Sequence, residues 1–207
     1  MESNWASEHL TVIRTLMERA AIYRRALAPI MLQLGALGVL ASAAGLGFGI
    51  DSVRGFGIYW IVVSVLGITA AYLKVRRQAL TAAEPFWSPP TRRVTQAVLP
   101  PLFAGLIATI LILAVPTEAT ERFVWIPAIW MGLYGCAIHA AGFFMPRGMK
   151  LFGWGFIVCG CAVAATLATG YSTPSAKTAH LLMGAFFGGL HLAYGVYLYF
   201  TERKNEA

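Results

Sequence analysis

Hydrophobic positions form six long runs that alternate with short polar segments along the chain. The runs cover residues 28–50, 56–73, 99–115, 123–144, 151–169 and 178–200. A helix needs about 20 mainly apolar residues to cross the hydrocarbon core of a bilayer. The sequence therefore predicts an all-α integral membrane protein, in which residues 27–201 form a six-transmembrane-helix bundle.

Proline residues mark several edges of the predicted spans. Pro29, Pro100 and Pro101 are expected to open spans, and Pro116 and Pro146 to close them. Proline is tolerated in the first turn of a helix, because the amides there lack intrahelical partners in any case.

The composition agrees with this class of protein. Of the 207 residues, 58% are hydrophobic and 12% are charged, whereas soluble domains carry about 25% charged residues. The net charge of +7 comes from basic residues in the short segments between apolar runs. This arrangement sets membrane topology and argues against nucleic-acid binding.

The basic residues are distributed unevenly between the two ends of the predicted bundle. Residues 1–26, the loop 74–98, the segment after span four and the tail 202–207 carry most of them, whereas the other side holds Arg54, Arg122 and Lys177. The positive-inside rule places the richer side in the cytoplasm. We therefore expect a bacterial inner-membrane protein with the loop 74–98 and both termini, including the tail, in the cytoplasm.

Residues 1–26 are predicted to form an amphipathic helix, in which Leu10, Ile13, Met17 and Ala20 recur at helical spacing. A basic amphipathic helix next to a membrane span typically lies in the cytoplasmic interface. Docking onto a partner, or covering the mouth of the bundle, is the alternative. The loop 74–98 contains Pro85, Pro89 and Pro90 and is interpreted as a proline-stiffened connector.

The predicted spans carry little catalytic chemistry. All nine acidic residues lie outside them, and sequence motifs of nucleotide-binding, zinc-protease and serine-hydrolase sites are missing. Cys136, Cys159 and Cys161 lie within apolar runs at spacings that fit neither a zinc site nor a disulfide framework. The sequence thus predicts no catalytic residue and favours a protein that is not an enzyme.

Two histidines lie on stripes of small residues. Gly132, Gly135, Cys136 and His139 follow one another at helical spacing in span four, as do Gly184, Gly188, His191 and Gly195 in span six. Such stripes are the faces at which membrane helices approach closely. We expect the five glycines to mediate helix packing and His139 and His191 to point into the bundle at similar depth. His180, by contrast, is expected at the partly hydrated external edge of span six.

Three functional hypotheses remain open from the sequence. The preferred one is an assembly or accessory membrane protein, which contacts the lipid bilayer and forms a homo-oligomer or binds a partner membrane protein through its small-residue stripes. The second is a small-solute transporter or channel, with a cavity lined by His139, His191, Tyr194, Cys136, Gln33 and Thr69. The third is a redox protein that binds haem through His139 and His191. No cofactor is predicted under the preferred hypothesis, and haem belongs to the third alone.

Overall fold

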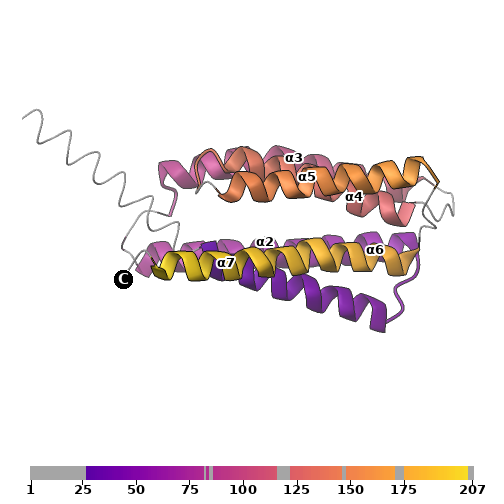
Figure 1. Ribbon diagram of the computed structural model, residues 1–207, viewed down its shortest axis with the longest axis horizontal. Coiled ribbons are helices and arrows are strands. Elements are labelled where there is room, and N and C mark those ends of the chain that lie inside the picture. Colours follow the sequence, from indigo (N-terminus) through magenta and orange to yellow (C-terminus); the bar gives the residue numbers. More distant parts are fainter. Residues whose placement is uncertain are drawn as a thin grey trace, which may run out of the picture.

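The computed structural model describes residues 27–81, 83, 86–115, 122–145, 148–170 and 175–204, and the regular structure within these ranges is helical (Figure 1). A first helix, Leu27–Gly47, is followed by α2 (Val53–Thr81), α3 (Pro89–Ala114), α4 (Arg122–Ala141) and α5 (Gly148–Ala168). The last rod consists of α6 (Ala176–Met183), the π-helix η1 (Gly184–Leu190) and α7 (His191–Lys204). Six of these helical stretches are long and apolar enough to cross a membrane, as predicted. The predicted amphipathic helix lies outside the described residues.

The helices form two layers, with α3, α4 and α5 in one layer and the first helix, α2 and the α6–η1–α7 rod in the other (Figure 1). The first helix runs antiparallel to the rod, because Gly45 faces His180 near one end and Leu32 faces Gly195 near the other. Half of the most hydropathic window of α4 is buried, against 11% of that of α3. The α4 helix is therefore central, whereas α3 is peripheral.

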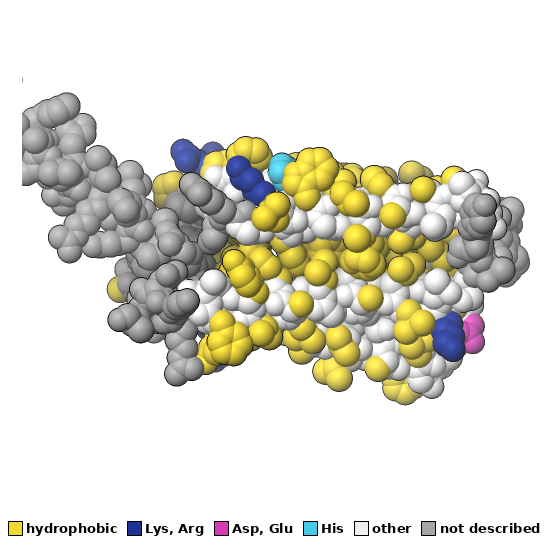
Figure 2. Space-filling model, in the orientation of Figure 1, with side chains coloured by type: hydrophobic (Ala, Val, Ile, Leu, Met, Phe, Trp, Pro, Cys, Tyr) yellow, Lys and Arg dark blue, Asp and Glu magenta, His cyan; other side chains and the backbone are white. Residues whose placement is uncertain are grey.

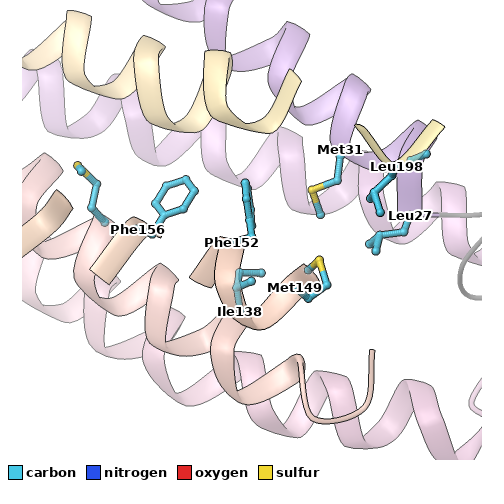
Figure 3. Packing of buried hydrophobic residues seen from close by; sticks show 9 residues of the cluster. Leu27, Met31, Ile138, Met149, Phe152, Phe156 and Leu198 are labelled. Atoms are coloured by element: carbon cyan, nitrogen blue, oxygen red, sulfur yellow. The ribbon is translucent and has the colours of Figure 1, made fainter. Parts of the chain in front are cut away.

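Large apolar side chains hold the layers together in two clusters. Figure 3 shows the first cluster, in which Met31 and Leu198 from one layer face Ile138, Met149 and Phe152 from the other. The second cluster is centred on Phe56, Trp60 and Ile126, which are almost fully buried. Burial of these large side chains supplies van der Waals contacts between the layers. The outer flanks carry exposed hydrophobic side chains, and Lys and Arg are visible at the ends (Figure 2).

The predicted connector 74–98 is largely helical, and the prediction of a long loop was wrong. The α2 helix continues to Thr81, and α3 already begins at Pro89. Lysine, arginine, glutamine, alanine and leucine, which dominate residues 74–81, are strong helix formers. Pro89 and Pro90 occupy the first positions of α3 after the N-cap residue Ser88, where proline is well tolerated.

Pro100 and Pro101 lie inside α3, so they do not open a span as predicted. Proline removes backbone donors and normally kinks or breaks a helix in water. In transmembrane helices it is tolerated because neighbouring groups and small local adjustments satisfy the freed carbonyls. Pro29 lies in the first described turn of the first helix, while Pro116 and Pro146 fall outside the described residues.

Candidate functional site

His180 is buried, with 1% of its surface exposed, so the expected partly hydrated position was wrong. The indole N–H of Trp60 donates a hydrogen bond to His180 Nδ1 over 3.2 Å. Because Nδ1 accepts, the ring proton lies on Nε2, which donates to the carbonyl oxygen of Ile50 over 3.2 Å. Both ring nitrogens are thus used by a neutral imidazole that links α2, α6 and the end of the first helix.

The end of the first helix positions the Ile50 carbonyl. Gly49 adopts a positive φ of 62°, Ile50 N–H donates to the Gly45 carbonyl over 3.1 Å, and Gly49 N–H donates to the Leu46 carbonyl over 3.3 Å. This pair of bonds is a Schellman motif, in which glycine takes the left-handed position without a Cβ penalty. The turn brings the Ile50 carbonyl within hydrogen-bonding distance of His180.

Two further hydrogen bonds tie the same region together. Ser42 Oγ donates to the His180 carbonyl over 2.7 Å, and Tyr59 Oη donates to the Ala41 carbonyl over 2.6 Å. The aromatic ring of Phe56 meets the imidazole edge-on, with the ring centroids 4.8 Å apart. We call Ser42, Tyr59, Trp60 and His180 the His180 cluster. Its polar atoms contact one another or backbone carbonyls, which is the arrangement of a structural node.

His191 forms a second buried polar site, with 2% of its surface exposed. Its Nδ1 lies 3.1 Å from the Phe186 carbonyl oxygen and its Nε2 lies 2.7 Å from Tyr134 Oη. A carbonyl can only accept, so the ring proton lies on Nδ1 and the Tyr134 hydroxyl donates to Nε2. This pair connects α4 in one layer to the rod in the other.

His191 directly follows the π-helix η1, and its ring bonds to a carbonyl five residues earlier, within that segment. π-Helical turns are rare and occur frequently at functional sites. The glycines of the sequence GAFFGGL allow the rod to approach the first helix closely over this stretch. The structure thus places a buried histidine directly after a π-helical turn.

Aromatic rings surround the imidazole of His191. The ring centroids of Phe152, Phe156 and Phe187 lie 5.1, 5.5 and 6.2 Å from it. Tyr194 stacks on Phe152 at 4.6 Å and so belongs to the same region. These rings exclude water from the Tyr134–His191 hydrogen bond.

His139 lies in a different environment. It is partly buried, its Nδ1 lies 3.5 Å from the Lys150 carbonyl oxygen, and its ring contacts Phe143 and Trp154 at 5.7 and 5.5 Å. None of these contact residues also contacts His191 in the described hydrogen bonds and ring pairs. The structure therefore does not bring the two histidines into one site.

The other proposed cavity residues do not converge either. Gln33, Thr69 and Cys136 are exposed on the outside of the described bundle, on three different helices. Tyr194 is the one member of the proposed set that lies near His191. Of the residues predicted to line a cavity, His191 and Tyr194 therefore lie in one region, where the structure adds Tyr134.

The small-residue stripes pack against helices of the same chain. A methyl group added at Gly188 would lie 2.7 Å from Val39 N, and one at Gly195 would lie 2.9 Å from Leu32 N. Gly184 similarly faces Ser42. In the other layer, a methyl group at Gly135 would lie 2.8 Å from Gly153 O, and one at Gly160 would lie 2.9 Å from Gly132 N. The two stripes therefore face different helices, which explains why His139 and His191 are not paired.

The described residues contain no group of three His, Cys, Asp or Glu side chains placed to share an ion. A haem held between His139 and His191 would require both imidazoles to face one space. Instead, both nitrogens of His191 are engaged by Tyr134 and Phe186. The residues present do not fit a bis-histidine haem in this arrangement.

Sequence reasoning missed Tyr134 and Trp60, the partners of the two buried histidines. A signal was present, because each lies well inside an apolar run, and a buried tyrosine or tryptophan needs a partner for its O–H or N–H. A similar pair occurs between Trp130 Nε1 and Thr109 Oγ1, 2.7 Å apart, which links α4 to α3. Pairing such donors with acceptors on other spans, however, requires the helix arrangement.

The fold defines a class of protein, a polytopic α-helical membrane protein with two buried histidine sites that join its helices. Comparisons with protein-family models, curated proteins and solved structures found no match.

Proposed function

We propose that the chain is a non-catalytic membrane protein that acts by assembling with other transmembrane helices, in the first instance with a second copy of itself. The observation that carries the proposal is the closed pairing of the polar core. Four side chains of this core form hydrogen bonds with one another or with backbone carbonyls, namely those of Tyr134, Trp60, His180 and His191. Such an interior stabilises a scaffold and presents no reactive group.

The small-residue stripes are occupied within the chain, so assembly would use another surface. The α3 helix supports this idea, because it is the least buried span. Exposed apolar side chains recur along α3 at the spacing of one helix face, at Leu99, Phe103, Leu106 and Ile110. Contacts between membrane helices arise from van der Waals packing, which such a face can supply.

Fluorescence energy transfer between differently labelled copies in liposomes tests the proposal. We expect transfer above the level of randomly distributed proteins, and a loss of transfer in a Phe103→Ala/Ile110→Ala variant. Leu151→Ala on α5, which also removes an exposed apolar side chain, is the matched control and should leave the transfer unchanged. Random-level transfer for the unmodified protein would refute self-assembly.

A second candidate function, transport of a small solute, is favoured by one specific observation. The Tyr134–His191 pair lies beside a π-helical turn and joins the two layers. Transporters commonly place substrate sites where interrupted helices meet near the membrane midplane. Liposomes containing the protein would then show solute flux that Tyr134→Phe reduces. Flux equal to that of empty vesicles across a solute panel would remove this candidate.

We also propose that this is a bacterial inner-membrane protein with both termini in the cytoplasm and an interfacial amphipathic helix in residues 1–26. The distribution of charge supports this orientation: Lys74, Arg76, Arg77, Arg92, Arg93 and Lys150 lie toward one end of the bundle, and Arg54 and Lys177 toward the other. In a cysteine-free background, a membrane-impermeant maleimide should label Gly47→Cys in intact cells but Thr81→Cys only after permeabilisation. The opposite labelling pattern would show that the protein has the opposite orientation in the membrane.

A further inference from the structure

Two cationic side chains lie over the rings of two consecutive phenylalanines at one end of the α3–α4–α5 layer. The Arg93 guanidinium on α3 lies 5.8 Å from the centroid of the Phe144 ring. The Lys150 ammonium on α5 lies 3.6 Å from the centroid of the Phe143 ring. One turn after α4 therefore holds cations from two other helices, and we call these four residues the cation–aromatic cluster.

Local packing fixes the position of the cluster. A methyl group at Gly142 would lie 3.1 Å from Lys150 N, so the turn rests closely on the start of α5. The His139 ring contacts both Phe143 and Trp154. The aromatic rings and the two cations are thus presented by a tightly packed corner in which three helices meet.

The charges of the cluster are not neutralised by described acidic groups. Asp51 is the one carboxylate whose side chain the structure describes, and it lies near the start of α2. That end of α2 is remote from the cluster, because Gly57 packs against Leu113 at the opposite end of α3 from Arg93. The described contacts of both cations are with the faces of aromatic rings, and no described carboxylate pairs with either of them.

The surroundings of the cluster are those of a membrane interface. Phe143, Phe144 and Trp154 are exposed, and tryptophan side chains concentrate at the level of the lipid headgroups. Leu151 and Val158, seven residues apart on α5, are exposed on one face of that helix. Figure 2 shows Lys and Arg beside hydrophobic side chains at this end of the layer.

We propose that the cation–aromatic cluster of Arg93, Phe143, Phe144 and Lys150 binds the phosphate headgroup of an anionic phospholipid. Arginine and lysine donate charge-assisted hydrogen bonds to phosphate oxygens. The acyl chains of the same lipid would lie against the exposed apolar side chains of α5. A soluble phosphate lacks this second contact, so the arrangement favours a lipid. The inference is independent of the proposed assembly.

Native mass spectrometry of the full-length protein, titrated with phosphatidylglycerol in detergent, tests the proposal. Removing one cation near a membrane surface weakens binding of an anionic lipid by about fivefold. We therefore expect about fivefold weaker binding for Arg93→Gln, and about 25-fold for Arg93→Gln/Lys150→Gln. The matched control, Arg54→Gln/Lys177→Gln, removes two exposed cations near the other end and should bind like the unmodified protein.

Two further measurements separate the alternatives. Phosphatidylcholine should bind more weakly than phosphatidylglycerol, and millimolar inorganic phosphate should not displace the lipid. Equal loss in the cluster and control variants would mean general charge attraction and would overturn the site. Displacement by inorganic phosphate would overturn the assignment to a lipid. The single variant Arg93→Gln changes an exposed side chain and keeps the test decisive if the double variant does not fold.

Discussion

The hydroxyl oxygen of Tyr134 lies 2.7 Å from Nε2 of His191, and this hydrogen bond joins the two helical layers within a ring of aromatic side chains. The same imidazole donates through Nδ1 to a carbonyl of the π-helical segment. One side chain thus connects the π-helical turn to the central helix α4. The energetic importance of this link is directly measurable.

Tyr134→Phe should lower the free energy of unfolding by about 1–2 kcal/mol. The substitution keeps the ring but leaves the buried Nε2 without a donor, and a membrane-buried hydrogen bond is worth about that much. Reversible unfolding in mixed detergent–lipid micelles measures the change. Tyr199→Phe on the exposed surface serves as the control, and equal stability of both variants would show that the bond contributes nothing.

The His180 cluster predicts energetic coupling between two residues that are distant in sequence. His180→Phe removes the acceptor of the Trp60 N–H, and Trp60→Phe removes the donor. Each variant alone should destabilise the protein by about 1–3 kcal/mol, because a buried polar group loses its partner. The double variant should be more stable than additivity predicts, by about 0.5–1.5 kcal/mol. Additive effects would show that the hydrogen bond seen between the two rings carries no coupling.

The number of spans followed directly from hydropathy, because the bilayer fixes the length of apolar sequence that a helix requires. Their boundaries were less predictable. The α2 helix extends through polar residues to Thr81, since residues with high helix propensity continue a helix beyond the apolar run. Pro100 illustrates the reverse error, because a residue that breaks helices in water lies inside α3.

The small-residue stripes were visible in the sequence, but their partner helices were not. Gly188 packs on the first helix and Gly135 on α5, and nothing in the local spacing of glycines encodes this choice. The expected pairing of His139 with His191 depended on both stripes facing one space. Since each stripe is covered by a different helix, Tyr134 becomes the partner of His191 instead.

Haem binding through the two histidines can be tested spectroscopically. We expect protein expressed with excess haem, or mixed with haemin after purification, to lack the absorption spectrum of bis-histidine ligation. The reason is that His191 uses both ring nitrogens internally while His139 contacts Phe143 and Trp154. A Soret band that disappears in both His139→Ala and His191→Ala would contradict the expectation, whereas one that persists in both would point to adventitious binding.

Two glycine-to-alanine substitutions should have opposite effects. At Gly188 the new methyl group would meet the backbone nitrogen of Val39 at 2.7 Å, so the rod and the first helix must separate. Overpacking of this kind costs about 1–3 kcal/mol. At Gly155 the space around the new methyl group is open, and alanine should stabilise the helix by up to about 1 kcal/mol.

Unfolding measurements on the two variants, made under identical lipid conditions, compare the effects directly. Both exchanges add one methyl group to a helical glycine, so differences in hydrophobicity and propensity largely cancel. A lower stability for Gly188→Ala and an equal or higher one for Gly155→Ala would establish that the first helix and the rod pack as described. Equal stabilities would mean that the two helices lie farther apart, since the added carbon would then meet no backbone atom.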